Sequence, residues 1–583
     1  MGPADAAGTA QVAFEPASLA LGEERDGVVT IRNGASRQVG PIRLQAGAVT
    51  TFSGSPVSYV SLQVSPDEIA KLDPDSARNV ALSLIFTSEP QPGTFRVALS
   101  ALLEEQRVGS LEISFTVAEL PPAGSGARVA ITAGPDAPRQ GDVVSYEAEV
   151  RDSAGKVQTG AAVGWTISPA SAGLTTADGH FVGYDPGEAK IIAAVQGAAD
   201  TLPITIASRG LSGSFSVVGR GPVSARYTSD VWVSGDHAYT GTWSCRSGVC
   251  GDRLYVWDAS DPGSPVRVDS ILIDARTVND VKIRADGTLG VITHEQSSDG
   301  LNGITLLDLT EPANPEVITR FTAGLTTGVH NVWIEGDYVY VAADGPGGGL
   351  RVVDVSDPTR PSTVASYYAG SSILHDVYVR DGLAFLSHWN AGLVILDVGN
   401  GVVGGSPMSP VEVGRIITAG GQVHNAWYWP AARYVFVGEE DFDTPGMMHV
   451  VDVSDLSHPK EVATFRVPGA TPHNFWLDED NEILFAAWYE RGLRALDVSG
   501  VLLGELGRQG REIAFSEYGI GSGCVGVTGT CTWAPQLHDG LIYLSDMNTG
   551  LWILQADSQL TPAFSTGMAS IRSMQSRATR SRN

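Results

Sequence analysis

Histidine followed by asparagine or aspartate stands at the start of a predicted strand at four positions in the second half of this sequence. Each pair precedes a run of alternating residues typical of a β-strand. The pairs are His330-Asn331, His375-Asp376, His424-Asn425 and His473-Asn474. Imidazoles are common ligands of Zn, Cu and Fe. Two interpretations stay open: the pairs hold successive repeats together through backbone hydrogen bonds, or some of them form a ring of ligands.

In two earlier repeats Asp230 and Asp280 stand at the second position of the pair. Polar or aromatic residues end the second strand of each hairpin. The two strands of a hairpin run antiparallel, so both positions are expected at one edge. We expect a ligand-binding mouth formed by Asp230, Asp280, His330, Asn331, His375, Asp376, His424, Asn425, His473, Asn474, His388, Trp389 and Trp488.

A metal site is the second possibility at this mouth, with a divalent or redox ion such as Zn, Cu or Fe as its cofactor. The acidic stretch EEDFD (439–443) favours Ca instead, although it lacks the spacing of a calcium loop. The candidate metal ligands are His294, Glu295, His330, His375, His424, His473, Glu439 and Glu440. Neither G-x-S-x-G nor H-E-x-x-H occurs, so no catalytic residue is predicted.

Seven repeats position these residues. Each contains a predicted hairpin, at 228–243, 278–295, 329–344, 374–389, 423–440, 472–490 and 533–547. A third strand follows each hairpin, a fourth follows in the first five, and the spacing is about 45–55 residues, as in propeller blades. The seventh repeat lacks its fourth strand, and GSFSVVGRG at 213–221 resembles one. We therefore predict an all-β protein whose seven-bladed β-propeller (211–556) is closed by an N-terminal strand.

GLVILDV and GLRVVDVSDP recur in the third strands and resemble the LVIVD repeat, whose family comprises predicted β-propellers found mostly on exported bacterial proteins. The resemblance covers roughly residues 211–556. It implies the fold and an exported setting, but no single activity. The aspartate that ends the third strand is expected to accept backbone N–H bonds in the turn that follows. It recurs as Asp258, Asp308, Asp354, Asp397, Asp452 and Asp497.

Two β modules are predicted before the propeller. Residues 1–118 contain short β runs with the alternation of an Ig-like β-sandwich, and a Pro/Gly/Ser linker follows at 119–127. In residues 128–208, VGWTISP, GHF and PGEAKIIAAV resemble the bacterial Ig-like (group 2) domains, which are usually spacers on exported proteins. The segment 557–583 has several arginines and almost no acid, and is expected to be a disordered tail.

The net charge is −27, from 38 Lys and Arg against 65 Asp and Glu. This balance argues against nucleic acid and anionic membrane surfaces as partners. No apolar run reaches the roughly 18 residues of a transmembrane segment. The pairs Cys245/Cys250 and Cys524/Cys531 lack the spacing of zinc knuckles and favour disulfides, formed locally or across neighbouring blades. Disulfides imply an oxidising compartment, and we expect an extracellular, periplasmic or cell-surface protein whose leader is absent from this chain.

The sequence therefore favours an exported binding protein. Its recognition face would be the channel mouth, with the Ig-like modules as spacers, and its ligand a protein, a polysaccharide or a small molecule. The alternative is a metal-dependent enzyme, for example an oxidoreductase. It rests on an architectural analogy with the selenium-binding/methanethiol oxidase family, whose histidine-lined propellers carry a redox metal.

Overall fold

The computed structural model describes residues 12–557 except for 17, 23–24, 52–53, 75, 87–91, 104–105, 118–122, 346–347, 371–372, 419–420, 443–444, 520, 522 and 526–528. Within these residues the regular elements are β-strands and two short 3-10 turns, which confirms the predicted all-β class. No described helix has the length and apolarity that a membrane span requires. Residues 119–122 of the predicted linker, and the predicted tail beyond Asp557, lie outside the described residues.

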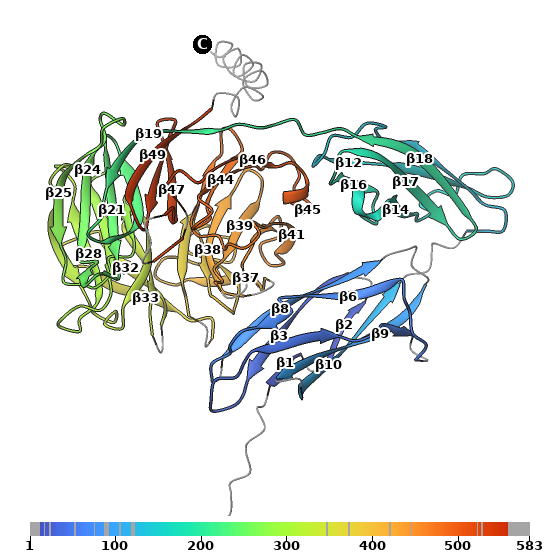
Figure 1. Ribbon diagram of the computed structural model, residues 1–583, viewed down its shortest axis with the longest axis horizontal. Helices are drawn as coiled ribbons and strands as arrows, with labels where there is room; N and C mark the ends of the chain where they lie inside the picture. Colours follow the sequence, from blue (N-terminus) through green and yellow to red (C-terminus); the bar gives the residue numbers. More distant parts are fainter. Residues whose placement is uncertain are drawn as a thin grey trace, which may run out of the picture.

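Seven four-stranded antiparallel units form a ring (Figure 1). Blade 1 contains β20 (Tyr227–Ser234), β21 (His237–Trp243), β24 (Arg253–Asp258) and β25 (Val266–Leu272). Blade 2 contains β26 (Val281–Ile283), β27 (Leu289–His294), β28 (Gly303–Asp308) and β29 (Glu316–Phe321). Blade 3 contains β30 (Val329–Glu335), β31 (Tyr338–Ala343), β32 (Gly349–Asp354) and β33 (Ser362–Tyr367). Blade 4 contains β34 (Asp376–Arg380), β35 (Leu383–Ser387), β36 (Leu393–Asp397) and β37 (Val411–Ile416).

The remaining three blades complete the ring. Blade 5 contains β38 (Val423–Trp429), β39 (Tyr434–Glu439), β40 (Met448–Asp452) and β41 (Lys460–Phe465), to which β45 (Gly504–Glu505) adds. Blade 6 contains β42 (Phe475–Asp478), β43 (Ile483–Ala487), β44 (Leu493–Asp497) and β46 (Glu512–Ser516). Blade 7 contains β47 (Thr532–His538), β48 (Leu541–Asp546), β49 (Gly550–Ala556) and β19 (Phe215–Pro222). Strand β46 gives blade 6 the fourth strand that the sequence pattern did not predict.

The ring closes through β19, as predicted. This strand pairs antiparallel with β49, from Phe215 opposite Ala556 to Pro222 opposite Gly550. The first strands of all seven blades contact one another in turn around the channel, and β47 of blade 7 contacts β20 of blade 1. Pairing the start of the propeller with its end covers the edge of β49 that would otherwise be open.

Apolar side chains on both faces of each blade hold the ring together. In β27 every residue is buried, because this blade packs between two neighbours. One cluster contains Leu289 of blade 2 and Val341 of blade 3, and another contains Phe436 of blade 5 and Leu484 of blade 6.

The recurrent third-strand aspartates accept the backbone N–H two residues later, which confirms their predicted role in the turn. The pairs are Asp258–Ser260, Asp308–Thr310, Asp354–Ser356, Asp397–Gly399, Asp452–Ser454 and Asp497–Ser499.

Two β modules precede the ring. In the first, one sheet has the order β1 (Val12–Glu15), β3 (Asp26–Asn33), β8 (Ala77–Phe86) and β6 (Val60–Ser65). The other has the order β2 (Ser18–Gly22), β10 (Gln106–Val117), β9 (Gly93–Leu103), β4 (Ile42–Ala46) and β7 (Glu68–Ile69), with β5 (Thr50–Thr51) beside β9. Residues of both sheets form one buried apolar cluster.

The second module contains three small sheets. They are β11 (Arg128–Ala133) with β13 (Glu147–Arg151); β12 (Val143–Ser145) with β16 (His180–Gly183) and β15 (Gly173–Thr175); and β14 (Gly164–Ser168) with β17 (Gly187–Val195) and β18 (Ala198–Ile206). Phe181, Ile191 and Ile204 form its core. That either module is Ig-like stays a prediction.

Both modules contact the ring, the first at blades 4 and 5 and the second beside blade 6. In the first module, Arg78 pairs with Asp441, and the backbone oxygen of Ala77 accepts a 2.8 Å hydrogen bond from Asn390. After the second module, Arg209 forms a buried ion pair with Asp497, with Nε 2.7 Å from the carboxylate.

Candidate metal and ligand site in the channel

The first strand of each blade lines the channel with three layers of side chains. Along β30 the order is His330, Asn331 and, two residues later, Trp333. We call these positions the histidine layer, the amide layer and the aromatic layer. The register of β30 against β31 shifts between Val329 and Asn331, and β38 shifts at the equivalent place before Asn425. A bulge of this kind redirects side chains, which explains how two successive residues both line the channel.

The four imidazoles of the histidine layer lie side by side across four blades. The distances between ring centroids are 4.3 Å for His330–His375, 4.3 Å for His375–His424 and 4.1 Å for His424–His473. Trp533 of blade 7 continues the row, 4.4 Å from His473. The structure therefore brings together all four predicted histidines.

Backbone hydrogen bonds orient two of these rings. Nδ1 of His375 lies 3.1 Å from the backbone oxygen of His424, and Nδ1 of His473 lies 2.6 Å from that of Trp533. A carbonyl oxygen only accepts, so Nδ1 carries the proton in both rings and Nε2 keeps a free lone pair. His375 and His473 thus link adjacent blades, as the first interpretation expects, and a ligand role for these rings stays a prediction.

Electrostatics keep three of the imidazoles neutral. Burial holds the pKa values of His375, His424 and His473 well below their ordinary value, and the neighbouring histidines add to the effect. Neutral imidazole is the form that binds a metal ion.

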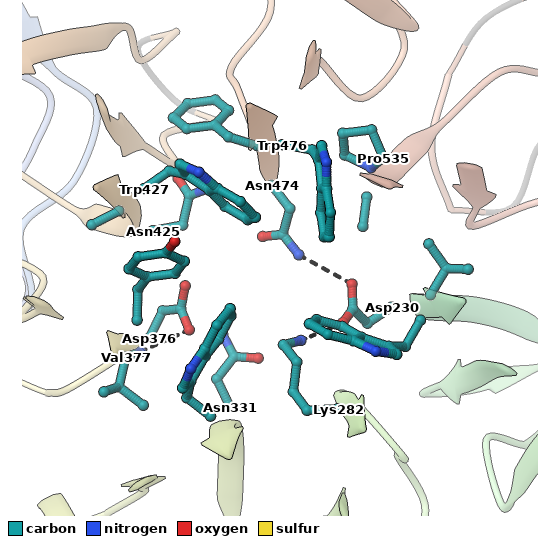
Figure 2. A pocket seen from close by; sticks show the side chains of 17 residues that line it. Asp230, Lys282, Asn331, Asp376, Val377, Asn425, Trp427, Asn474, Trp476 and Pro535 are labelled. Atoms are coloured by element: carbon teal, nitrogen blue, oxygen red, sulfur yellow. Dashed lines mark hydrogen bonds and ion pairs between the residues drawn. The ribbon is translucent and has the colours of Figure 1, made fainter. Parts of the chain in front are cut away.

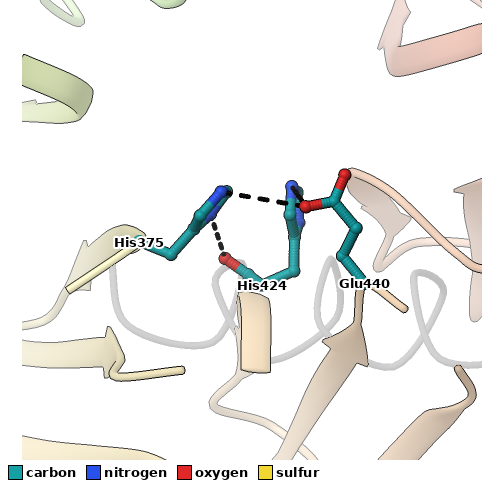
Figure 3. A group of neighbouring side chains, drawn as sticks. All are labelled: His375, His424 and Glu440. Carbon is teal, nitrogen blue, oxygen red and sulfur yellow. Dashed lines mark hydrogen bonds and ion pairs between the residues drawn. The ribbon is translucent and has the colours of Figure 1, made fainter. Parts of the chain in front are cut away.

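Glu440 faces two of these histidines, at the end of β39 in blade 5 (Figure 3). Its carboxylate lies 3.9 Å from Nε2 of His375 and 4.0 Å from Nε2 of His424. The ligand atoms of the three residues all lie within 4.8 Å of one another. Burial raises the pKa of Glu440, while a hydrogen bond from the Tyr489 hydroxyl favours its carboxylate form.

A second trio of ionisable groups lies beside the first. Glu295, His330 and Asp344 also have ligand atoms within 4.8 Å of one another. Nδ1 of His330 is 2.9 Å from Glu295. Burial alone would lower the pKa of His330, but the hydrogen bond and charge of Glu295 outweigh it and raise that pKa to about 9. His330 is therefore protonated in an ion pair, which makes it a poorer metal ligand than the neutral His375 and His424.

Four residues expected at the mouth do not face it. His294, His388, Glu439 and Trp488 are buried within the blades. Glu439 pairs with His449 at 2.9 Å, and Trp488 Nε1 donates to the Ala470 oxygen at 3.1 Å. Side chains alternate between faces along a strand without a bulge. Where two polar or aromatic residues stand next to each other at the end of a second strand, only one of them therefore faces the channel.

The following residue takes the place at the channel in each case. These residues are Glu295, Trp389, Glu440 and Tyr489. The ring of Trp389 lies 5.0 Å from that of His375, and the ring of Tyr489 lies 4.8 Å from that of His473. Both residues have positive φ, 36° for Trp389 and 39° for Tyr489. Bulky residues seldom adopt this conformation, and where it occurs it tends to cluster at functional sites.

The amide layer combines links between blades with charge. Asn279 donates to the backbone oxygen of His330 at 3.0 Å, and Asp280 accepts the N–H of Val332 at 2.9 Å. Lys282 bridges Asp280 and Asp230, with Nζ 2.6 Å from the latter. The predicted Asp230, Asn331, Asp376, Asn425 and Asn474 all line the channel here. Burial and the charge of Asp280 raise the pKa of Asp376 to about 7.

The aromatic layer was not predicted as part of the site. Its members are Trp232, Trp333, Tyr378, Trp427 and Trp476. The signal was present in the sequence, where an aromatic residue stands three positions after each histidine of a pair, as in HNVW, HDVY, HNAW and HNFW. Together with the amide layer these rings surround a cavity of about 500 Å³, including its open side (Figure 2).

The four cysteines form two local pairs. Cys245 bonds to Cys250 across the short hairpin of β22 (Cys245–Arg246) and β23 (Val249–Cys250), and Cys524 bonds to Cys531. The first pair follows β21 of blade 1 and the second precedes β47 of blade 7, so the two loops belong to adjacent blades. The predicted disulfides therefore pair locally, and not across blades.

Comparison with known proteins bears on the repeats. No curated protein matches the chain. The model of the LVIVD repeat matches residues 225–272, 328–369, 373–418 and 433–467, which correspond to blades 1, 3 and 4 and most of blade 5. These matches confirm that the chain contains LVIVD repeats within its β-propeller.

Proposed function

We propose that this protein is a metal-binding β-propeller protein whose channel mouth holds a divalent transition-metal ion through His375 Nε2, His424 Nε2 and the Glu440 carboxylate. The observation that carries the proposal is the convergence of these three ligand atoms within 4.8 Å of one another. Nδ1 of His375 makes the backbone hydrogen bond, and no hydrogen bond to Nε2 of this ring is present among the residues that the structure describes.

The spacing of the three groups suits a transition metal. Bonds of about 2.0–2.2 Å to nitrogen and oxygen place tetrahedral ligand atoms roughly 3.3–3.5 Å apart. The separations from Glu440 are 3.9 Å and 4.0 Å, about half an ångström too long, and no separation in the trio exceeds 4.8 Å, so side-chain rotation would have to bring the three ligand atoms closer together. The nitrogen ligands favour Zn or Cu over Ca or Mg, which prefer oxygen.

Neighbouring groups support the same three ligands. The Nδ1–H of His375 is held by a backbone oxygen, and Tyr489 donates to Glu440. Such outer partners orient metal ligands and fix the imidazole tautomer. The disulfides Cys245–Cys250 and Cys524–Cys531 favour a protein that works outside the cytosol.

A metal-dependent enzyme is the second candidate function. The observation that favours it is the number of ligands, because three protein groups leave a coordination position free for water or a substrate. A binding role and a catalytic role share the same metal site. Turnover of a substrate would distinguish the catalytic role from the binding role. The metal site, which both roles require, is tested first.

The experiment is a metal analysis of protein purified without a histidine tag. We expect apo protein to take up one Zn or Cu ion per chain, as measured by isothermal titration and elemental analysis. The double variant His375→Ala/His424→Ala and the single variant Glu440→Gln should lose this uptake. The control is His458→Ala, because His458 is exposed (83% for its side chain) and lies in a blade-5 turn.

Retention of one tightly bound ion by the double variant would contradict the proposal. Loss of the ion in His330→Ala, with normal uptake in the double variant, would move the site to Glu295, His330 and Asp344. An apo protein that takes up no ion would contradict metal binding altogether.

A further inference from the structure

The cavity beyond the histidine layer has chemistry of its own. Its walls are the aromatic layer, and its polar lining comes from the amide layer (Figure 2). None of the four histidines of the mouth lines it. We propose that this cavity binds a small quaternary ammonium ion, held against Trp333, Tyr378 and Trp427 and neutralised by Asp376.

Three aromatic rings form one continuous wall of the cavity. The ring centroids are 4.6 Å apart for Trp333–Tyr378, 4.9 Å for Tyr378–Trp427 and 6.5 Å for Trp333–Trp427. Trp333 and Trp427 are only partly buried, so their surfaces are open to a ligand. The face of an aromatic ring carries partial negative charge and attracts cations, and cages of such rings recognise quaternary ammonium groups.

Another part of the same cavity already contains a cation. Nζ of Lys282 lies 5.3 Å from the ring centroid of Trp232 and pairs with Asp230 and Asp280. Here a cation, an aromatic ring and carboxylates combine within the protein itself.

Asp376 provides a carboxylate without such a cation. It stands two residues before Tyr378 on β34, and side chains two apart on a strand point to the same face. Within the described residues no ion pair reaches it, and its carboxylate accepts one hydrogen bond, from the N–H of Val377 at 2.7 Å. An external cation would supply the missing partner.

The charge and size of the cavity restrict the ligand. Carboxyl groups outnumber cations around the cavity, with Asp230, Asp280 and Asp376 against Lys282, and the whole chain carries −27. Anions are therefore disfavoured. The enclosed space is only about 50 Å³, which suits a small ion better than a polymer. Small alkali ions hold their water strongly, whereas a methylated ammonium group enters an aromatic site at a lower desolvation cost.

The repeats provide a conservative variant. Asn331, Asn425 and Asn474 occupy the position of Asp376 in blades 3, 5 and 6. The substitution Asp376→Asn therefore introduces a side chain that the ring already accommodates, and removes only the charge. Asp381→Asn is the matched control, since Asp381 lies in the exposed turn of the same blade with a 63% exposed side chain.

The test is a calorimetric titration of metal-free protein with choline and with its neutral isostere 3,3-dimethyl-1-butanol. Working without metal makes the result independent of the proposed metal site. We expect saturable choline binding and at least tenfold weaker binding of the isostere. Asp376→Asn should weaken choline binding about tenfold, and Trp427→Leu should weaken it several-fold. Asp381→Asn should leave it unchanged.

Equal binding of choline and its isostere would overturn the proposal, because the cavity would then be merely apolar. Unchanged choline affinity in Asp376→Asn, or no saturable binding of choline and tetramethylammonium to the unmodified protein, would overturn it too. Thermal unfolding of each variant shows whether it is folded. If Asp376→Asn fails to fold, the isostere comparison and Trp427→Leu still decide the outcome.

Discussion

Nδ1 of His375 lies 3.1 Å from the backbone oxygen of His424, and Nε2 of the same ring lies 3.9 Å from Glu440. One imidazole therefore links blade 4 to blade 5 and still offers a lone pair to the mouth of the channel. The same kind of link recurs at His473, whose Nδ1 lies 2.6 Å from the backbone oxygen of Trp533. The carboxylate is present at only some blades, and that asymmetry locates the proposed metal site.

The first prediction concerns the partner of Glu440. Tyr489→Phe removes the hydroxyl that donates to this carboxylate. Loss of an outer partner typically weakens metal binding about 10–100-fold, so we expect the Zn dissociation constant to rise about tenfold with unchanged stoichiometry. Competition with a chromophoric chelator measures it. Tyr368→Phe is the control, because Tyr368 is 51% exposed, and equal affinities in the two variants would contradict the prediction.

The second prediction concerns stability at alkaline pH. His449 is fully buried between Glu439, at 2.9 Å, and Glu461, at 2.6 Å. Burial alone would lower the pKa of His449, but the two carboxylates raise it from 6.5 to about 10. The folded state thus binds this proton more tightly than the unfolded chain does. The stabilisation is complete below about pH 6.5 and disappears as the pH rises through about 10.

Urea unfolding of the unmodified protein and of His449→Gln, at several pH values between about 6 and 10, tests this sign. We expect the stability advantage of the unmodified protein to decrease steadily across this range. His458→Gln should show no such trend, because His458 is exposed. A difference between the unmodified protein and His449→Gln that is independent of pH would contradict the assigned ion pair.

The third prediction compares two aspartates that stand in equivalent turns of blades 5 and 6. Asp452 and Asp497 both accept a backbone N–H two residues later, at 2.7 Å and 2.9 Å. Only Asp497 also pairs with Arg209, and both side chains of that pair are 1% exposed. Removing one partner of a buried ion pair costs about 3–5 kcal/mol. Asp497→Ala should therefore lower the free energy of unfolding by about 3 kcal/mol more than Asp452→Ala, as measured by urea unfolding. Equal losses would show that the turn hydrogen bond accounts for the whole effect.

The fourth prediction concerns closure of the ring. A chain of residues 211–583 retains β19, whereas a chain of residues 224–583 lacks it and exposes the edge of β49. An unpaired edge strand promotes association with other chains. We expect the longer chain to be monomeric by light scattering and the shorter chain to aggregate or unfold at lower temperature. Identical behaviour of the two would show that β19 is dispensable.

Much of the fold follows from local pattern. Alternating apolar residues and turn residues recur in every repeat, so seven blades are predictable, and the orphan strand at 213–221 identifies the closure. Strand β46 was missed because the segment between Asp497 and Glu512 first adds β45 to blade 5 before the chain returns to blade 6. This pairing depends on a contact between two blades, and it produces no repeating pattern in the sequence.

The sequence by itself determined the repeat, the ring and the four histidines at one end of the channel. The tertiary structure decided which of two adjacent polar residues faces that channel, as with Glu440 and not Glu439. It also decided that Lys282 pairs with Asp230 and Asp280, while no ion pair reaches Asp376 among the described residues. The reason is physical. The period of the repeats and the amino-acid composition predict local elements along the chain. The direction in which each side chain points, and the residues around it, depend on bulges, strand ends and closure of the ring.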